Sequence, residues 1–164
     1  MLHIQHTENL MPSSKPKTMD QIVSRITTEC LAVRIRMINR TITAIYDHAL
    51  RPLGVTVGQL NILVVVAHHG PVSPNEIARR LHMEKSTVSR SAARMSDNGW
   101  LNVEPAPSGH KQLLTTSAKG EALLGRSLPA WDKAQTRARA ALSPAGASSI
   151  HQIGNALLSR RGPQ

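Results

Sequence analysis

Cysteine is almost absent from this 164-residue sequence, in which Cys30 is the only one. A single thiol cannot form an intramolecular disulfide, and it cannot supply a cysteine cluster for zinc. We therefore expect a reducing, cytoplasmic compartment. The sequence also lacks a run of about 18 apolar residues, and its first 18 residues hold no apolar stretch long enough for a signal peptide. We expect neither a membrane span nor export.

Aromatic side chains are scarce as well, with no phenylalanine, one tyrosine and two tryptophans. A core must therefore be built from aliphatic residues and methionine, which suits packed helices better than a large sheet. Because 40% of the residues are hydrophobic, the chain can bury such a core without disulfides or a metal. These features predict a mainly α-helical protein.

Acidic residues are half as frequent as basic ones, 10 against 20, and the formal net charge is +10. Such a surplus favours polyanionic partners, with nucleic acid ahead of an acidic membrane or an acidic protein. Charge alone does not choose among the three.

The N-terminal third predicts a basic arm followed by one long helix. Residues 1–18 show little periodicity, whereas apolar residues recur at helical spacing over residues 19–51, until Pro52 and Gly54 end the pattern. A helix of about 30 residues is roughly 45 Å long, which exceeds the width of a small domain. Part of its apolar stripe therefore needs a second chain, and we expect a dimer.

The middle of the chain predicts three short helices and a hairpin. Thr56 is a candidate N-cap, Ser73 and Glu76 form a candidate capping box with Pro74 at the first helical position, and Gly99 is a candidate C-cap. The predicted elements are a buried helix up to Gly70, a short helix over residues 73–81, a second helix from Ser86 to Asn98, and strands over residues 100–104 and 111–116. This order is that of a winged helix-turn-helix.

Helical periodicity returns after residue 118 and continues to the C-terminal region. Pro129 should bend or interrupt this helix, because proline lacks the backbone donor. Ser143 and Pro144 should start a final helix.

The second helix of the motif is the candidate DNA-contacting element. Its exposed face would present hydrogen-bond donors of the kind that meet phosphates and major-groove base edges. These are Lys85, Ser86, Thr87, Ser89, Arg90 and Arg94.

Four segments in this order and spacing resemble the MarR family of transcriptional regulators: residues 53–59 (LGVTVGQ), 77–81 (IARRL), 85–90 (KSTVSR) and 116–124. The resemblance covers roughly residues 20–160. It implies a homodimeric winged-helix repressor or activator that binds double-stranded DNA at a pseudo-palindromic operator, and of the two we expect a repressor. The implied organisation is an arm (1–18), an N-terminal dimerisation helix (19–53), a DNA-binding lobe (54–117) and C-terminal dimerisation helices (118–164).

The wing departs from the family pattern. Where relatives carry an acidic residue and an arginine, this chain has Ser108, Gly109 and His110. His110 and Lys111 are the remaining candidates for a wing contact with DNA. Between residues 54 and 117 the charge surplus is only 6 − 4 = +2, so most of the basic residues lie elsewhere.

The resemblance also implies that a small phenolic or amphipathic ligand, bound between the dimer helices and the lobe, releases DNA. Arg36, Tyr46 and His48 are the candidate ligand residues, together with the neighbouring Asp47, although charged residues near a helix end are often simply solvated. Cys30 is either a buried, inert thiol or, as in some relatives, a peroxide sensor. The histidines are scattered, so we expect no metal and no cofactor.

Enzyme signatures are missing from the sequence. It has no phosphate-binding glycine-rich loop with lysine, no nucleophile elbow and no dinucleotide fingerprint, and we expect no enzymatic activity. The alternative to a regulator is a winged-helix dimer that has lost operator recognition and serves as a protein-interaction scaffold.

Overall fold

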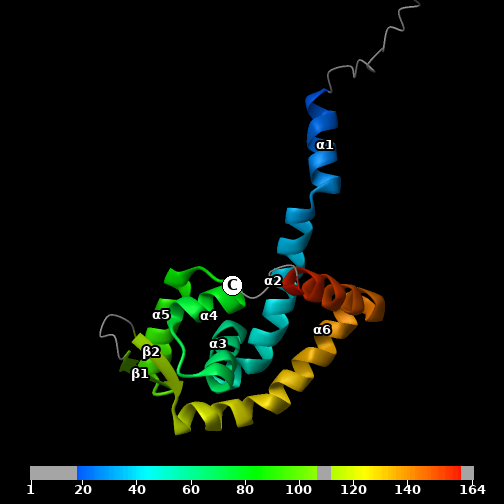
Figure 1. Ribbon diagram of the computed structural model, residues 1–164. Coiled ribbons are helices and arrows are strands. Elements are labelled where there is room, and N and C mark those ends of the chain that lie inside the picture. Colours follow the sequence, from blue (N-terminus) through cyan, green and yellow to red (C-terminus); the bar gives the residue numbers. More distant parts are fainter. Residues whose placement is uncertain (1–17, 107–111, 160–164) are drawn as a thin grey trace, which may run out of the picture. The chain divides into compact units, whose positions relative to one another are not determined.

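The structure, a computed structural model, describes residues 18–106 and 112–159. The chain divides into two compact units, Met1–Asn39 and Arg40–Gln164. Helix α1 (Met19–Glu29) lies in the first unit, and α2 (Leu31–Leu50) begins there and ends in the second (Figure 1). The predicted mainly helical winged helix-turn-helix is confirmed.

The single helix predicted for residues 19–51 is wrong at Cys30, where the backbone is extended (φ −67°, ψ 107°) and separates α1 from α2. Two threonines of the turn before Cys30 bond back to the main chain. The hydroxyls of Thr27 and Thr28 donate to main-chain carbonyls four residues earlier, both at 2.8 Å, which weakens the helix. The side chain of Arg34 then donates to the carbonyl of Thr28 at 2.8 Å. Cys30 is half-buried rather than buried.

The second unit holds the winged helix-turn-helix. Its elements after α2 are η1 (Arg51–Leu53), α3 (Val57–His69), α4 (Pro74–Leu81), α5 (Lys85–Asp97), β1 (Leu101–Pro105), β2 (Gln112–Thr116) and α6 (Ala118–Ser159). The two strands pair antiparallel, from Leu101 opposite Thr116 to Pro105 opposite Gln112. A further bridge joins Val72, just before α4, to Leu114 of β2.

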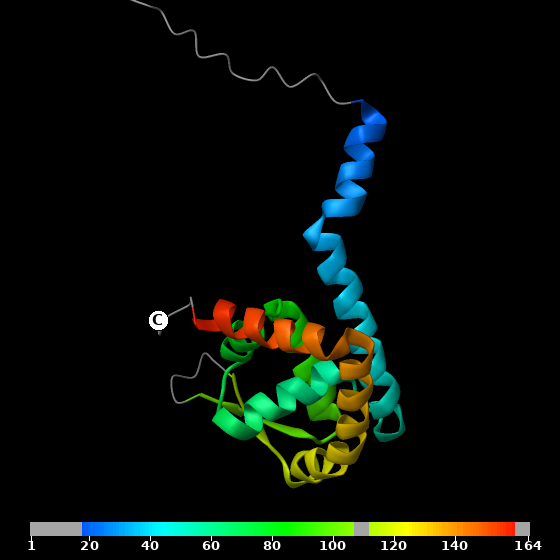
Figure 2. The ribbon, with the colours of Figure 1, turned by 90° about the vertical axis from the view of Figure 1, so that its right-hand side faces the viewer.

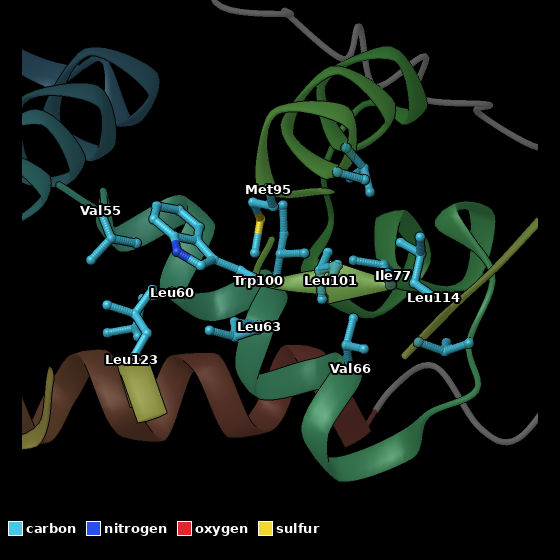
Figure 3. Close-up of a cluster of buried hydrophobic side chains, with 14 of the residues drawn as sticks. Val55, Leu60, Leu63, Val66, Ile77, Met95, Trp100, Leu101, Leu114 and Leu123 are labelled. Carbon is cyan, nitrogen blue, oxygen red and sulfur yellow. The ribbon is translucent and has the colours of Figure 1, made fainter. Parts of the chain in front are cut away.

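Helix α3 is the centre of the core. It is apolar on most of its circumference and packs against α4, α5, β2 and α6. Figure 3 shows its buried side chains meeting those of the surrounding elements. Burying one such side chain contributes about 1.5–3 kcal/mol. The cluster includes Leu60, Leu63 and Val66 of α3 with Ile77, Met95, Trp100, Leu101, Leu114 and Leu123.

Thr56 caps α3 as predicted, because its hydroxyl accepts from the Gln59 N–H and the Gln59 side chain accepts from the Thr56 N–H. At α4 the predicted capping box is only half formed. The Ser73 hydroxyl accepts from the Glu76 N–H at 3.3 Å, but the Glu76 carboxylate accepts instead from Arg80, at 2.6 Å. A charged donor one turn away outcompetes a neutral backbone N–H.

The turn between α4 and α5 is tight. His82 caps α4 in the left-handed region (φ 51°), and Ala78 of α4 is small and buried, as the packing of the two helices requires. Helix α5 begins at Lys85 with Glu84 as N-cap, slightly earlier than predicted. It ends with Asn98 as C-cap, followed by Gly99 at φ 72°.

Helix α6 bends at Ser143, which has non-helical angles (φ 62°, ψ 161°), and Figure 2 shows the two limbs meeting there. The Ser143 hydroxyl accepts from the Gly146 N–H at 3.3 Å and so starts the second limb, as predicted. The expected interruption at Pro129 is absent from α6 as described. Leu123 and Ala134, on either side of Pro129, are both buried, and such packing can stabilise a helix that lacks one backbone hydrogen bond.

None of the described helices, taken singly, has both the length and the apolar character to cross a membrane.

Candidate nucleic-acid interface

Helix α5 has one buried face and one exposed face. Val88, Ala92 and Met95 point into the core, at the i, i+4, i+7 spacing of a single helical stripe. The opposite face therefore turns its polar side chains to solvent. The predicted contact residues Lys85, Ser86, Ser89, Arg90 and Arg94 are exposed, and Thr87 is half-buried.

The cations of α5 form no ion pair with any other described residue. Across residues 18–106 and 112–159, ion pairs join Arg25 to Glu29 and Glu76 to both Arg79 and Arg80. Arg90 contacts only a neighbouring hydroxyl, Thr87, at 3.5 Å. Glu76 thus engages Arg79 and Arg80 of α4, whereas the arginines of α5 have no ion pair among the described residues.

The N-terminus of α5 receives no side-chain cap from its N-cap residue, Glu84. The first amide groups of a helix carry a partial positive charge and are ready donors for an anion such as phosphate. Lys85 stands at this same end.

The hairpin β1–β2 occupies the position of a wing after α5. Its exposed strand residues include Asn102, whose side-chain amide donates to the Thr115 hydroxyl at 3.5 Å. The predicted wing contacts His110 and Lys111 lie outside the described residues.

The three candidate ligand residues have different environments. Tyr46 is half-buried, its hydroxyl bonds Gln135 of α6, and its ring lies 6.5 Å from that of Trp131. Burial raises the Tyr46 pKa above its ordinary value, and the positive charge of Arg139 opposes this shift. Arg36 and His48 are exposed on α2.

A cavity of about 450 Å³ lies at the bend of α6. It is lined by Arg139, Ala140, Pro144, Ala147, Ser148 and His151, so none of the three candidate ligand residues belongs to its described lining. Within the described ranges, no three His, Cys, Asp or Glu side chains are grouped as metal ligands.

Asp47, which the sequence grouped with the candidate ligand residues, has a structural contact instead. Its Oδ1 accepts from the Val57 N–H at 2.7 Å, at the first residue of α3. Donor and acceptor lie ten residues apart across a turn, so no local spacing rule for helix caps would have identified this pair.

His69, at the end of α3, makes one contact that depends on pH. Local desolvation lowers the His69 pKa below its ordinary value of 6.5, and the positive charges of Arg80 and His68 act in the same direction, against Glu76. The Arg80 Nη1 lies 3.3 Å from the His69 Nε2. The folded state therefore resists protonation at this ring.

We expect the free energy of unfolding to fall as the pH drops below about 6.5, because the unfolded state then binds a proton that the folded state still excludes. The His69→Gln variant should lose this part of the pH dependence, measured by urea unfolding at pH 7.5 and pH 5.5. His151→Gln, which changes a histidine elsewhere, should keep it. If the free energy of unfolding had the same pH dependence in wild type and His69→Gln, His69 would not be the group responsible for it.

Comparisons with known proteins agree with this architecture. A sequence model of the MarR family matches residues 53–112. The chain is 28% identical over 90 residues to the uncharacterized HTH-type transcriptional regulator YwoH of Bacillus subtilis (strain 168), a match that covers 53% of this chain and 66% of YwoH, just under two thirds of that protein.

Two solved structures are similar over most of the chain. The M. tuberculosis transcriptional regulator MosR is 28% identical, with a TM-score of 0.68, over 80% of this chain and 98% of MosR. A mutant MarR from E. coli, solved in complex with operator DNA, has a TM-score of 0.71 at 18% identity, over 82% of this chain and 97% of that one, and shows the shared fold. The motifs, the fold and the sequence model agree: residues 53–112 match the MarR family, and the chain shares the fold of MarR.

Proposed function

We propose that this protein is a sequence-specific DNA-binding transcriptional regulator that acts as a homodimeric repressor on a pseudo-palindromic operator. The observation that carries the proposal is the exposed face of α5. It combines hydroxyl groups, arginines without an intramolecular ion pair in the described chain, and a helix N-terminus without a side-chain cap. These are donors suited to phosphates and to base edges in the major groove.

Exposed apolar side chains support the homodimer. A soluble monomer rarely leaves so many large apolar groups in contact with water along its helices. A twofold axis would place two copies of α5 about 34–36 Å apart, one turn of B-DNA. The exposed residues include Ile22, Val23, Ile26, Leu31, Val33, Ile35, Met37 and Ile38 on α1 and α2, and Leu128, Ile150, Ile153 and Leu157 on α6.

We extend the proposal to release of DNA by a small phenolic or amphipathic ligand near Tyr46, with Arg36 and His48 as further candidates. Tyr46 supports it, because its ring and hydroxyl join α2 to α6 at a half-buried position. A ligand that competes for this contact would act on two helices of the protein at once.

Selection from random duplex DNA by the purified full-length protein tests the proposal. We expect an enriched, inverted-repeat sequence whose binding survives unrelated competitor DNA. Its affinity should fall about 10³-fold or more between 50 and 200 mM salt if six or more phosphates are contacted. The measurement is a salt titration by fluorescence anisotropy.

No enrichment, and no preference over competitor at about 150 mM salt, would overturn the proposal and favour the protein-interaction scaffold. A scrambled duplex of the same composition is the matched control, because it keeps the phosphate charge and removes the sequence.

A further inference from the structure

The end of α2 is attached to two other helices by adjacent residues. Tyr46 contacts α6 through Gln135 and Trp131, and Asp47 accepts a hydrogen bond from the first N–H of α3. Because consecutive helical residues point about 100° apart, one turn of α2 can hold two elements at once.

The hydrogen bond from the Val57 N–H to Asp47 places a carboxylate at the N-terminus of α3. It is short, 2.7 Å from Oδ1 to the Val57 nitrogen, and partly buried. A carboxylate at a helix N-terminus satisfies an otherwise unpaired N–H and interacts favourably with the helix dipole. It also crosses the turn between α2 and α3, which contains η1 and Gly54 in the left-handed conformation (φ 70°).

The position of α3 determines the position of α5, which carries the proposed DNA-contacting face. It packs directly on α4, α5 and β2, and its buried residues lie in the same cluster as Val88 and Met95 of α5. A well-packed core moves as a unit, so a rotation of α3 relative to α2 would carry α5 with it.

We propose that Asp47 is a positioning residue for operator recognition. By holding the start of α3 on the end of α2, it sets the orientation of α5 relative to α2, and hence the half-site spacing that the dimer accepts. This inference rests on the proposed function, because spacing has meaning only for a dimer on an operator.

Two variants separate positioning from simple helix capping. Asp47→Ala removes the contact between α2 and α3. Thr56→Ala removes the local N-cap of the same helix, the hydroxyl that accepts from the Gln59 N–H at 3.3 Å, and leaves the Asp47 contact in place. Both should lower the denaturation midpoint similarly, since both remove one cap of α3. Asp47→Asn keeps an acceptor oxygen and should restore the wild-type behaviour in large part.

The first measurement needs no DNA. Spin labels are attached at exposed positions on α2 and α5, Ala44→Cys and Ala93→Cys, in a Cys30→Ser background, and labelled chains are diluted into excess unlabelled protein. Pulsed electron paramagnetic resonance then reports the distance distribution within one chain. Asp47→Ala should broaden this distribution by about half or more, whereas Thr56→Ala and Asp47→Asn should not.

The second measurement compares the selected operator with duplexes that carry one or two extra base pairs between the half-sites. Each base pair rotates one half-site by about 34°, so wild type and Thr56→Ala should bind the altered duplexes at least about tenfold more weakly. For Asp47→Ala this penalty should shrink at least about threefold, because a less constrained lobe adapts to the wrong spacing.

Unchanged distance distributions in Asp47→Ala, or equal changes in Asp47→Ala and Thr56→Ala, would overturn the positioning role. If wild type selects no operator while Asp47→Ala alone broadens the distribution, the proposed function fails and the spacing proposal fails with it, although Asp47 would still be shown to hold α3.

Discussion

Replacing Arg90 with alanine is expected to weaken specific operator binding about 5- to 150-fold, the effect of losing one good base or phosphate contact. Arg90 lies on the exposed face of α5, backed by the buried stripe that contains Val88. Its contact within the chain is with the Thr87 hydroxyl at 3.5 Å, so the guanidinium is available to DNA. Anisotropy titrations with the selected operator at several salt concentrations measure the effect.

The salt dependence distinguishes the two roles open to Arg90. A base contact predicts a loss confined to the specific sequence, whereas a phosphate contact predicts uniform weakening and a salt slope smaller by about one. The folded state should be little affected, within about 0.5 kcal/mol, because the side chain is exposed.

Arg126→Ala on α6 is the matched control, since it removes the same charge from an exposed helix position outside α5. Its effect on operator affinity should be at most about twofold. If Arg90→Ala bound the operator as tightly as Arg126→Ala does, the DNA-contacting face would have to lie elsewhere than on α5.

Gly120→Ala is expected to destabilise the folded protein by about 1–3 kcal/mol or more. A Cβ at Gly120 would lie 2.2 Å from the Trp100 carbonyl oxygen and 3.3 Å from the Leu63 Cδ1. The first clash is with the main chain, which cannot rotate away. The same carbonyl already accepts from the Ser117 N–H at 3.2 Å, so relief would require moving the start of α6 away from the hairpin.

Urea unfolding followed by circular dichroism measures this effect, with Gly125→Ala as control. Gly125 lies on the same helix, and a Cβ there would meet nothing within 4 Å. That substitution should leave stability unchanged or raise it by up to about 1 kcal/mol, because alanine is the better helix former. A Gly120→Ala protein as stable as Gly125→Ala would show that α6 does not approach Trp100 this closely.

Features that depend on neighbouring residues were predictable from the sequence. The N-cap Thr56, the restart of α6 at Ser143 and the buried stripe of α5 all rest on contacts three or four residues apart. The motifs of the winged helix-turn-helix are short and local as well, so this fold and the exposed polar face of α5 were predictable from the sequence.

Features that depend on competition between partners, or on residues far apart in the sequence, were not predictable from the sequence. Glu76 prefers Arg80 to the backbone of Ser73, and α6 continues through Pro129 with buried residues on both sides of it. The long N-terminal helix breaks at Cys30, where side chains of the preceding turn bond back to the main chain.

Charge, helical periodicity and caps are local properties, so the sequence alone predicts a basic, mainly helical protein with a winged helix-turn-helix and an exposed polar face on its second helix. The bond from Asp47 to the start of α3 and the bond from Tyr46 to α6 follow from the tertiary fold. These contacts join residues 10 and 89 positions apart, and such pairs exist only once the core has brought the helices together.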